Sequence, residues 1–123
     1  MSRKITRKGI IRKLDKLVSE IVIGRDRSCI VCGSFRNLTC GHLFSRIAYS
    51  TRWDLDNCFA QCLSCNLKHE HDPYPMTETV KAKGINIDEL HRKYVTPIKF
   101  KTFELIELYE KLKLILDKQQ AVV

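Results

Sequence analysis

Two Cys-x-x-Cys pairs constrain the fold of this chain more than any other feature of its sequence. The first pair is Cys29 and Cys32, and the second is Cys62 and Cys65. A tight turn lets two thiolates at this spacing face one cation, and two such pairs supply the four thiolates of a tetrahedral structural zinc site. The long gap between the pairs must then hold an inserted hairpin. The sequence predicts a small domain built around zinc.

The six cysteines could instead form three disulfides, as in a small secreted protein. Two observations argue against disulfides. The N-terminal segment MSRKITRKGIIRK lacks the apolar run of a secretory signal, and four of the cysteines have the paired spacing typical of zinc ligands. Cys40 and Cys58 remain, and we interpret both as small buried apolar side chains.

Length and composition describe one small domain. A chain of 123 residues has a limited core, which a structural metal would reinforce. Its 44% hydrophobic and 29% charged residues are ordinary for a soluble protein. No stretch approaches the ~20 apolar residues of a membrane span. We therefore expect a cytoplasmic protein, in a bacterium or a phage-infected host cell, with no membrane partner.

The net charge of +8 indicates a polyanionic partner such as DNA. Nine basic residues against three acidic ones fall within residues 1–27, and Arg12 and Lys13 are candidate phosphate contacts. Such contacts give salt-dependent affinity that is largely blind to sequence. The alternative is a solvated helix face that follows a loose tail.

The pattern of apolar residues divides the chain into three parts of one compact unit. Residues 1–25 hold a basic tail and an amphipathic helix over 8–22 that ends near Gly24. Residues 26–75 begin at the first cysteine pair, where Gly33 can take a positive φ. They continue with a strand over 38–44, a loop to about Trp53, a second strand, and a helix from the second cysteine pair to the prolines at 73 and 75.

Residues 76–123 are predicted to be helical. One or two turns precede Gly84, and Asp88 is the expected N-cap of a helix over 89–94. A longer helix over 102–118 has a wide apolar face, which needs either the first helix or another subunit as its partner. The second possibility would make the chain a homodimer. The predicted class is a small zinc-stabilised α+β fold with helices at both ends.

A histidine and an asparagine lie beside the predicted zinc. Hydrolysis of a phosphodiester needs a base that deprotonates water and positive charge on the phosphate. His42 is the candidate base, since its ordinary pKa of about 6.5 leaves it largely neutral. Alternatively, His42 joins Cys40 in a zinc site or is a packed strand histidine. Asn66 follows Cys65 directly, and its side-chain oxygen suits a hard Mg²⁺ ion.

Other side chains near these two residues could complete the site. His69 and Glu70 lie three and four residues after Asn66 on the same helix face, and we expect one of them, preferably His69, to bind the catalytic metal. Basic side chains that could contact phosphate are Arg46, Arg52 and Lys68. The alternative for the arginines is a salt bridge to Asp54 or Asp56. Trp53 is predicted to be core.

Several motifs together resemble the phage NinG (Rap) recombination nucleases. The match runs in order over roughly residues 14–94. Its segments are LDKLVSE at 14–20, RDRSCIVCG at 25–33, CGHL at 40–43, TRWDLDN at 51–57, QCLSCN at 61–66, and Gly84 with IDEL at 87–90. The wider relatives are the His-Asn-His, or ββα-metal, nucleases, including phage junction resolvases with a four-cysteine zinc.

The resemblance implies a ββα-metal core and a Mg²⁺- or Mn²⁺-dependent DNA endonuclease that cuts branched intermediates such as Holliday junctions or D-loops. It gives His42, Asn57 and Asn66 the catalytic roles, with Asn57 bracing the loop that aims the histidine. One departure is Gly41, because many relatives have a metal-binding acid or histidine directly before the catalytic histidine. A non-catalytic zinc module that binds nucleic acid and a restriction or homing nuclease are the alternatives.

Overall fold

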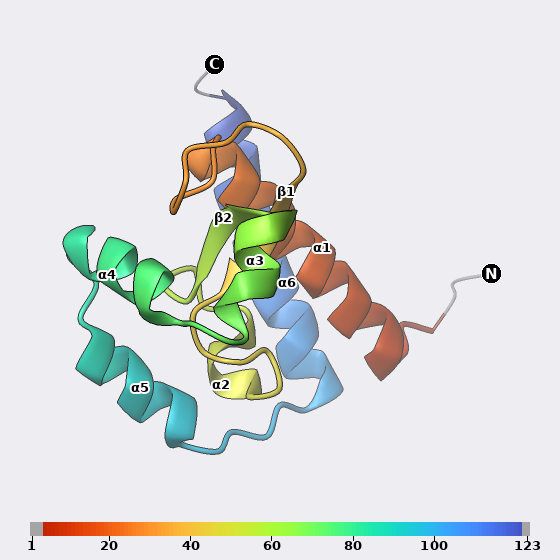
Figure 1. The fold of residues 1–123 in the computed structure, drawn as a ribbon. Helices are drawn as coiled ribbons and strands as arrows, with labels where there is room; N and C mark the ends of the chain where they lie inside the picture. Colours follow the sequence, from red (N-terminus) through yellow and green to blue (C-terminus); the bar gives the residue numbers. More distant parts are fainter. Residues whose placement is uncertain (1–3, 122–123) are drawn as a thin grey trace.

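The computed structural model describes residues 4–121, which form a two-stranded sheet surrounded by helices (Figure 1). The predicted α+β class is therefore confirmed. The elements of the described residues follow in this order: α1 (Arg7–Asp26), β1 (Leu38–His42), α2 (Tyr49–Arg52), β2 (Cys58–Cys62), α3 (Leu63–His69), α4 (Tyr74–Ala82), α5 (Ile87–Val95) and α6 (Thr102–Ala121).

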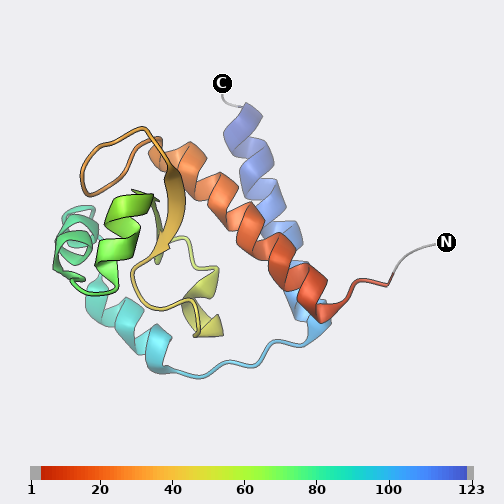
Figure 2. The ribbon, with the colours of Figure 1, turned by 45° about the vertical axis from the view of Figure 1, so that its right-hand side comes forward.

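Helices α1 and α6, from opposite ends of the described chain, pack along each other on one side of the sheet (Figure 2). The apolar stripe of α1 is buried as the helical spacing predicts, with Leu14 and Val22 fully inaccessible. Leu105 and Leu112 of α6 pack into the same core. The apolar face predicted at 102–118 therefore has the first helix as its partner. A second subunit stays a prediction.

The two strands are antiparallel, with His42 opposite Cys58 and Leu38 opposite Cys62. Side chains alternate between the two faces of the sheet. Cys58 and Ala60 enter the core that lies under α1, whereas Phe59 enters a second core with Met76 of α4 and Leu90 of α5. The sheet thus separates the helix pair from α3, α4 and α5. Trp53 belongs to the first core, as predicted.

The outer edge of β2 is paired with side chains and a loop. The Ala60 N–H donates to a carboxylate oxygen of Asp26 at 2.8 Å, and the Ala60 carbonyl accepts from Ile30 N–H at 3.0 Å. The guanidinium of Arg25 donates to the Cys58 carbonyl at 2.8 Å. The last turn of α1 is thereby tied to the strand that leads into the second cysteine pair.

Two helix limits differ from prediction. Helix α1 continues through Gly24 to Asp26, and Arg27 ends it in the left-handed conformation at φ 64°. Gly24 lies against α6, where an added Cβ would meet the Gln119 amide oxygen at 3.3 Å. At α5, the N-cap is Asn86 rather than Asp88, because the Asn86 side chain accepts from the Glu89 N–H at 3.1 Å.

The prolines at 73 and 75 lie beyond the end of α3, as predicted. They flank Tyr74, the first residue of α4. Proline is tolerated in the first turn, where the missing N–H would be unpaired anyway. Between the strands, the predicted loop contains the short helix α2, and the first strand ends at His42 rather than at residue 44.

Candidate functional site

The four paired cysteines converge at one end of the sheet. Their sulfur atoms all lie within 4.8 Å of one another, and all six cysteines of the chain are free thiols. Cys29 and Cys32 come from the loop after α1, where Gly33 takes the expected positive φ of 79°. Cys62 ends β2, and Cys65 lies in the first turn of α3. This cluster could hold a metal ion such as zinc.

The protonation of this cluster reflects the crowding of its sulfurs. Burial opposes ionisation of Cys29, but backbone N–H groups, with that of Cys32 first among them, lower its pKa to about 6. Burial and then hydrogen bonds with neighbouring thiols raise the pKa of Cys65 to about 12. A cation bound among the four sulfurs would favour their joint ionisation, with release of the thiol protons.

Helix α3 depends on the cysteines at its start for its position. Each of its residues is at least partly exposed, so little apolar burial fixes the helix. Two side-chain hydrogen bonds also hold α3 against the rest of the fold. Asn66 Nδ2 donates to Thr39 Oγ1 at 2.9 Å, and His69 Nε2 donates to the Leu43 carbonyl at 3.0 Å.

His42 ends β1 with its ring held by one hydrogen bond. Its Nε2 lies 2.9 Å from the carbonyl oxygen of Arg52. A carbonyl only accepts, so Nε2 carries the proton and the Nδ1 of the neutral ring has a free lone pair. The Arg52 carbonyl is available because α2 ends at that residue, and the last carbonyls of a helix have no partner inside it.

The surroundings of His42 favour its neutral form. Burial lowers its pKa below the ordinary value, and the positive charge of Arg46 acts in the same direction. The hydrogen bond to the Arg52 carbonyl and the charge of Asp15 oppose these effects without overcoming them. A neutral imidazole with a free Nδ1 is the form that can accept a proton from water.

Asn57 is fully buried and holds together the connection between the strands. Its side chain accepts from Phe44 N–H at 2.8 Å and donates to the carbonyls of Phe44 and Thr51, both at 3.0 Å. The Asn57 carbonyl also accepts from Leu43 N–H at 2.9 Å. These bonds fix the backbone directly after His42 to the helix that carries the Arg52 carbonyl. This is the geometry that a brace for the histidine requires.

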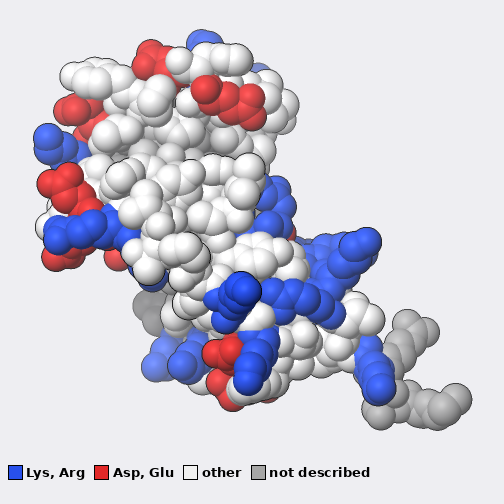
Figure 3. Space-filling model, turned by 90° about the horizontal axis from the view of Figure 1, so that it is seen from below, with Lys and Arg blue, Asp and Glu red and all other residues white. Residues whose placement is uncertain are grey.

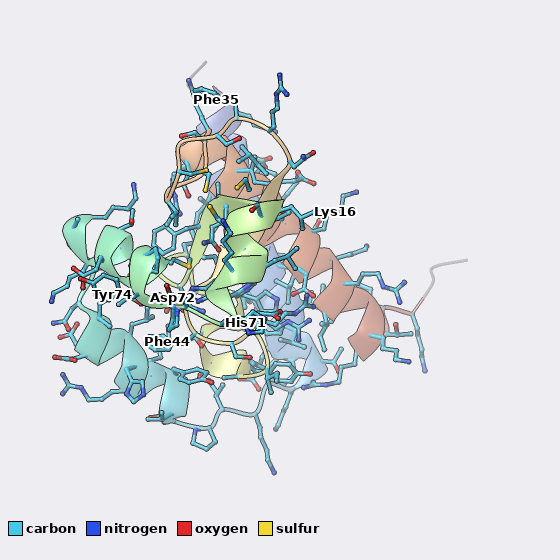
Figure 4. All side chains as sticks on the ribbon, in the orientation of Figure 1. Lys16, Phe35, Phe44, His71, Asp72 and Tyr74 are labelled. Carbon is cyan, nitrogen blue, oxygen red and sulfur yellow. The ribbon has the colours of Figure 1, made fainter. Side chains whose placement is uncertain are left out.

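His42, Asn66, His69 and Glu70 line one open pocket of about 550 Å³. Thr39 Oγ1 donates to the Gln61 carbonyl at 2.8 Å, so it can only accept from the amide nitrogen of Asn66. The Oδ1 of Asn66 therefore remains free for a ligand in the pocket. Phe44 forms another part of the lining, with its ring stacked on Tyr94 of α5 at 5.0 Å between centroids (Figure 4).

The two residues proposed to complete a metal shell differ in availability. His69 uses Nε2 to bind the Leu43 carbonyl, and its Nδ1 is buried and, among the described residues, without a hydrogen-bond partner. Glu70 is exposed at the end of α3 and faces the pocket. Asn66 and Glu70 offer oxygen atoms, the ligand type that a hard cation prefers, whereas the Nδ1 of His69 is buried where it stands.

Packing against Gln61 favours a glycine directly before His42. An added Cβ at Gly41 would lie 2.0 Å from the side-chain oxygen of Gln61. Gln61 faces Thr39 and Gly41 across the sheet and is 1% exposed. A metal-binding side chain at position 41 would therefore require the buried Gln61 side chain to move.

A comparison with family models finds one match that covers most of the chain. Residues 3–116 match the family described as bacteriophage lambda NinG protein. The chain belongs to the NinG family. No curated protein and no solved structure matches it significantly. The match extends beyond the motifs at residues 14–94 and includes most of α6, so the flanking helix pair is part of the NinG pattern.

Asp15 connects α1 of this NinG chain to the candidate site, and its sequence context did not predict that role. Its carboxylate accepts from Arg52 Nε and Nη2 at 2.9 and 2.6 Å, from Trp53 Nε1 at 2.8 Å, and from Arg46 Nη2 at 3.2 Å. Asp54 or Asp56 was the expected salt-bridge partner if the arginines did not contact phosphate, but Asp54 pairs with Lys93. Asp15 therefore positions Arg52, whose carbonyl orients His42.

The remaining basic candidates of the NinG chain differ in accessibility. Arg46 is 61% exposed and beside His42, whereas the side chain of Arg52 is 14% exposed and occupied by Asp15. Arg12, Lys13 and Lys68 are exposed. Lys16, which the sequence analysis did not select, lines a second pocket together with His42 and Arg46 (Figure 4).

Basic side chains are unevenly spread over the surface of the NinG chain. On the face in Figure 3, Lys and Arg gather in the lower and right-hand part of the view, near the N-terminal end, and most acidic side chains lie away from them. Five exposed basic residues come from the first half of α1: Arg7, Lys8, Arg12, Lys13 and Lys16. Among the described residues, no helix is long and apolar enough to cross a membrane.

Proposed function

We propose that this NinG-family chain is a divalent-metal-dependent DNA endonuclease of the His-Asn-His type. The observation that carries the proposal is the state of His42. Its ring is fixed by the Arg52 carbonyl through Nε2 and buried enough to stay neutral, and it lines a pocket with Asn66. A histidine that served only packing would not need an oriented free nitrogen beside a polar pocket.

The β1, β2 and α3 order supports a ββα-metal core. In this proposal zinc is held by the four paired cysteines and keeps α3 in place. A Mg²⁺ or Mn²⁺ ion would be held by Asn66 and Glu70, with His69 as a further ligand after rearrangement. When bound, that ion would supply positive charge at the scissile phosphate and the leaving 3′-oxygen.

The protein groups have separate roles in hydrolysis. His42 Nδ1 accepts the proton of the attacking water, and Asn57 holds the backbone that aims the ring. Arg46 is exposed beside His42 and binds the phosphate, with Lys16 as a second positive charge. The exposed basic side chains of α1, including Arg12 and Lys13, hold the DNA backbone without reading its sequence. Lys68 adds to these contacts from α3.

The substrate is proposed to be branched recombination DNA, such as a Holliday junction or a D-loop. Contacts that depend on phosphates rather than on base edges favour recognition of shape. The second candidate function is a non-catalytic zinc module that binds DNA through the same basic surface. Asn66 lines the pocket and donates through its Nδ2 to Thr39, and this arrangement favours the nuclease over the alternative.

The test is cleavage of a labelled four-way junction and a matched linear duplex with added Mg²⁺ or Mn²⁺. Wild type is expected to cut the junction preferentially, and His42→Ala to lose about 10²–10⁴-fold in rate while it binds the junction normally. His71→Ala, which removes an exposed histidine just after α3, is the matched control and should cut like wild type.

The dependence on pH distinguishes His42 as the base. Because the pKa of His42 is lowered in the fold, its neutral form persists below the ordinary value of about 6.5. Cleavage should therefore fall off only at a pH below that value. Binding of the junction without cleavage by wild type, with either metal, would contradict the nuclease and favour the non-catalytic module.

A further inference from the structure

Three metal-ligating side chains outside the four-cysteine cluster meet on the α1-facing side of the sheet. His42 and Cys58 are directly opposite each other across the strands, and Cys40 is two residues before His42 on the same face. Their ligand atoms all lie within 4.8 Å of one another. The same upper limit holds for the four-cysteine cluster, although no Cys-x-x-Cys pattern marks this second group in the sequence.

We propose that Cys40, Cys58 and His42 form a second metal site, which takes a thiophilic cation such as Zn²⁺. Two thiolates and one imidazole are soft and borderline ligands that prefer zinc to magnesium. Three protein ligands leave a fourth tetrahedral position for water. This site differs from the Mg²⁺ or Mn²⁺ site at Asn66 and Glu70, whose ligands are oxygen atoms.

A cation can reach the three side chains from solvent. Cys40 and His42 are partly exposed and line both the pocket of about 550 Å³ that faces α3 and a pocket of about 280 Å³ that faces α1. Cys58 is fully buried behind them. The ion would therefore enter beside His42 and have Cys58 as its innermost ligand.

Two of the three groups, Cys58 and His42, already share a polar partner whose contacts metal binding would replace. The Cys58 thiol lies 3.5 Å from the Arg52 carbonyl, which also accepts from His42 Nε2 at 2.9 Å. A cation bound between these groups would release the thiol protons of Cys40 and Cys58, so zinc affinity should rise with pH. The binding is thus a proton-for-metal exchange with no change in oxidation state.

Zinc at this position and proton transfer by His42 exclude each other. If Nδ1 binds the ion, the free lone pair is used, and if Nε2 binds it, the bond that orients the ring is lost. Zinc would therefore act as an inhibitor that competes at the base rather than at the Mg²⁺ ligands. This consequence rests on the proposed nuclease function, whereas the binding of zinc does not.

The first experiment counts zinc ions per chain by native mass spectrometry, on full-length protein titrated with Zn²⁺ under a reducing agent. Wild type and the His71→Ala control are expected to hold two zinc ions at saturation, and Cys40→Ser/Cys58→Ser to hold one. One ion in wild type, or two in the double variant, would overturn the site. Circular dichroism checks that the double variant keeps the wild-type helix content.

A second readout needs no variant. Alkylation of the partly exposed Cys40 in wild type should slow strongly when zinc exceeds one equivalent, and an unchanged rate would also overturn the site. Zinc should then slow Mg²⁺-dependent cleavage by wild type, and equal inhibition of Cys40→Ser/Cys58→Ser would contradict the competition. If no condition gives cleavage, the proposed function fails while the zinc counts still decide the site.

Discussion

The two faces of the β1–β2 sheet are covered in different ways. The face toward α1 is closed by a long helix pair, and the core there includes a dozen buried residues from α1, the sheet, Trp53 and α6. Among the described residues, the opposite face has a core of five buried residues, which come from β2, α4, α5 and the position directly after β1. Helix α3 lies over that side with all its residues at least partly exposed.

The elements on the two faces are therefore stabilised by different interactions. Burial of apolar surface accounts for the helix pair. It cannot account for α3, which is positioned by Cys62 and Cys65 and by two hydrogen bonds from Asn66 and His69. A metal bound at the cysteine cluster would therefore position the residues that line the pocket from α3, whereas His42 depends on α1 through Asp15 and Arg52.

The largest expected effect comes from loss of that metal. Structural zinc supplies roughly 10–16 kcal/mol in zinc-finger peptides, as much as the whole stability of many domains. Chelation or Cys62→Ser should therefore release α3 and the loop after α1. Hydrogen exchange measured by mass spectrometry should accelerate most in residues 28–37 and 62–70, with α1 and α6 slowest to exchange.

Leu14→Ala is the matched change on the other face. Leu14 is fully buried in the helix-pair core, so its truncation should cost about 2–5 kcal/mol. The order of exchange among elements should stay as in wild type. Equal acceleration of all elements in Cys62→Ser would mean that the two faces form one cooperative unit, and the comparison would fail.

Gly41→Ala tests the packing of Gly41 against Gln61 on the α3 side of the sheet and should have a moderate effect. The new methyl group would lie 2.0 Å from the buried Gln61 oxygen, and overpacking of this kind costs about 1–3 kcal/mol. Denaturant unfolding measures the loss. In a Gln61→Ala background the same substitution should cost much less, and equal cost in both backgrounds would contradict the steric explanation.

Asp15→Asn should have the smallest effect on stability and a specific effect on the site. The substitution weakens hydrogen bonds that the charged carboxylate accepts, and such bonds are worth roughly 1–3 kcal/mol. Because Asp15 is partly exposed, we expect a loss of stability at the low end of this range. The negative charge of Asp15 raises the pKa of His42, so its removal should lower that pKa further. The acid limb of the cleavage profile would then move to lower pH than in wild type.

A purely structural role for Asp15 predicts a different result. In that case Asp15→Asn would lower the melting temperature and leave the pH profile where it is. Asp54→Asn, which removes a different carboxylate that pairs with Lys93, is the control and should not move the acid limb.

Much of the fold could be predicted from local patterns in the sequence. The cysteine pairs predict the four-thiol cluster, and the apolar spacing predicts both helices of the flanking pair, because these features depend on neighbours within a few residues. The contacts of Asp15 could not be found in this way. It meets Arg52 and Trp53 across 37 and 38 residues, and the helical spacing of α1 gives only the direction of its side chain.

Other features that the sequence did not predict also depend on contacts between residues far apart in the chain. Cys40 and Cys58 have no paired spacing, so only the strand register brings them together with His42. Gly24 resembles a helix stop in sequence, but the approach of Gln119 of α6 gives the glycine a packing reason inside the helix. In each case a partner distant in sequence decides the role of the residue.

The bonds along the outer edge of β2 have a consequence for the behaviour of the protein in concentrated solution. A free strand edge is a template on which another chain can add a strand, and this is a common route to aggregation. Here Asp26 and Ile30 pair with the N–H and the carbonyl of Ala60, and Arg25 pairs with the carbonyl of Cys58. A fold with so short a sheet is thereby protected from self-templated growth along this edge.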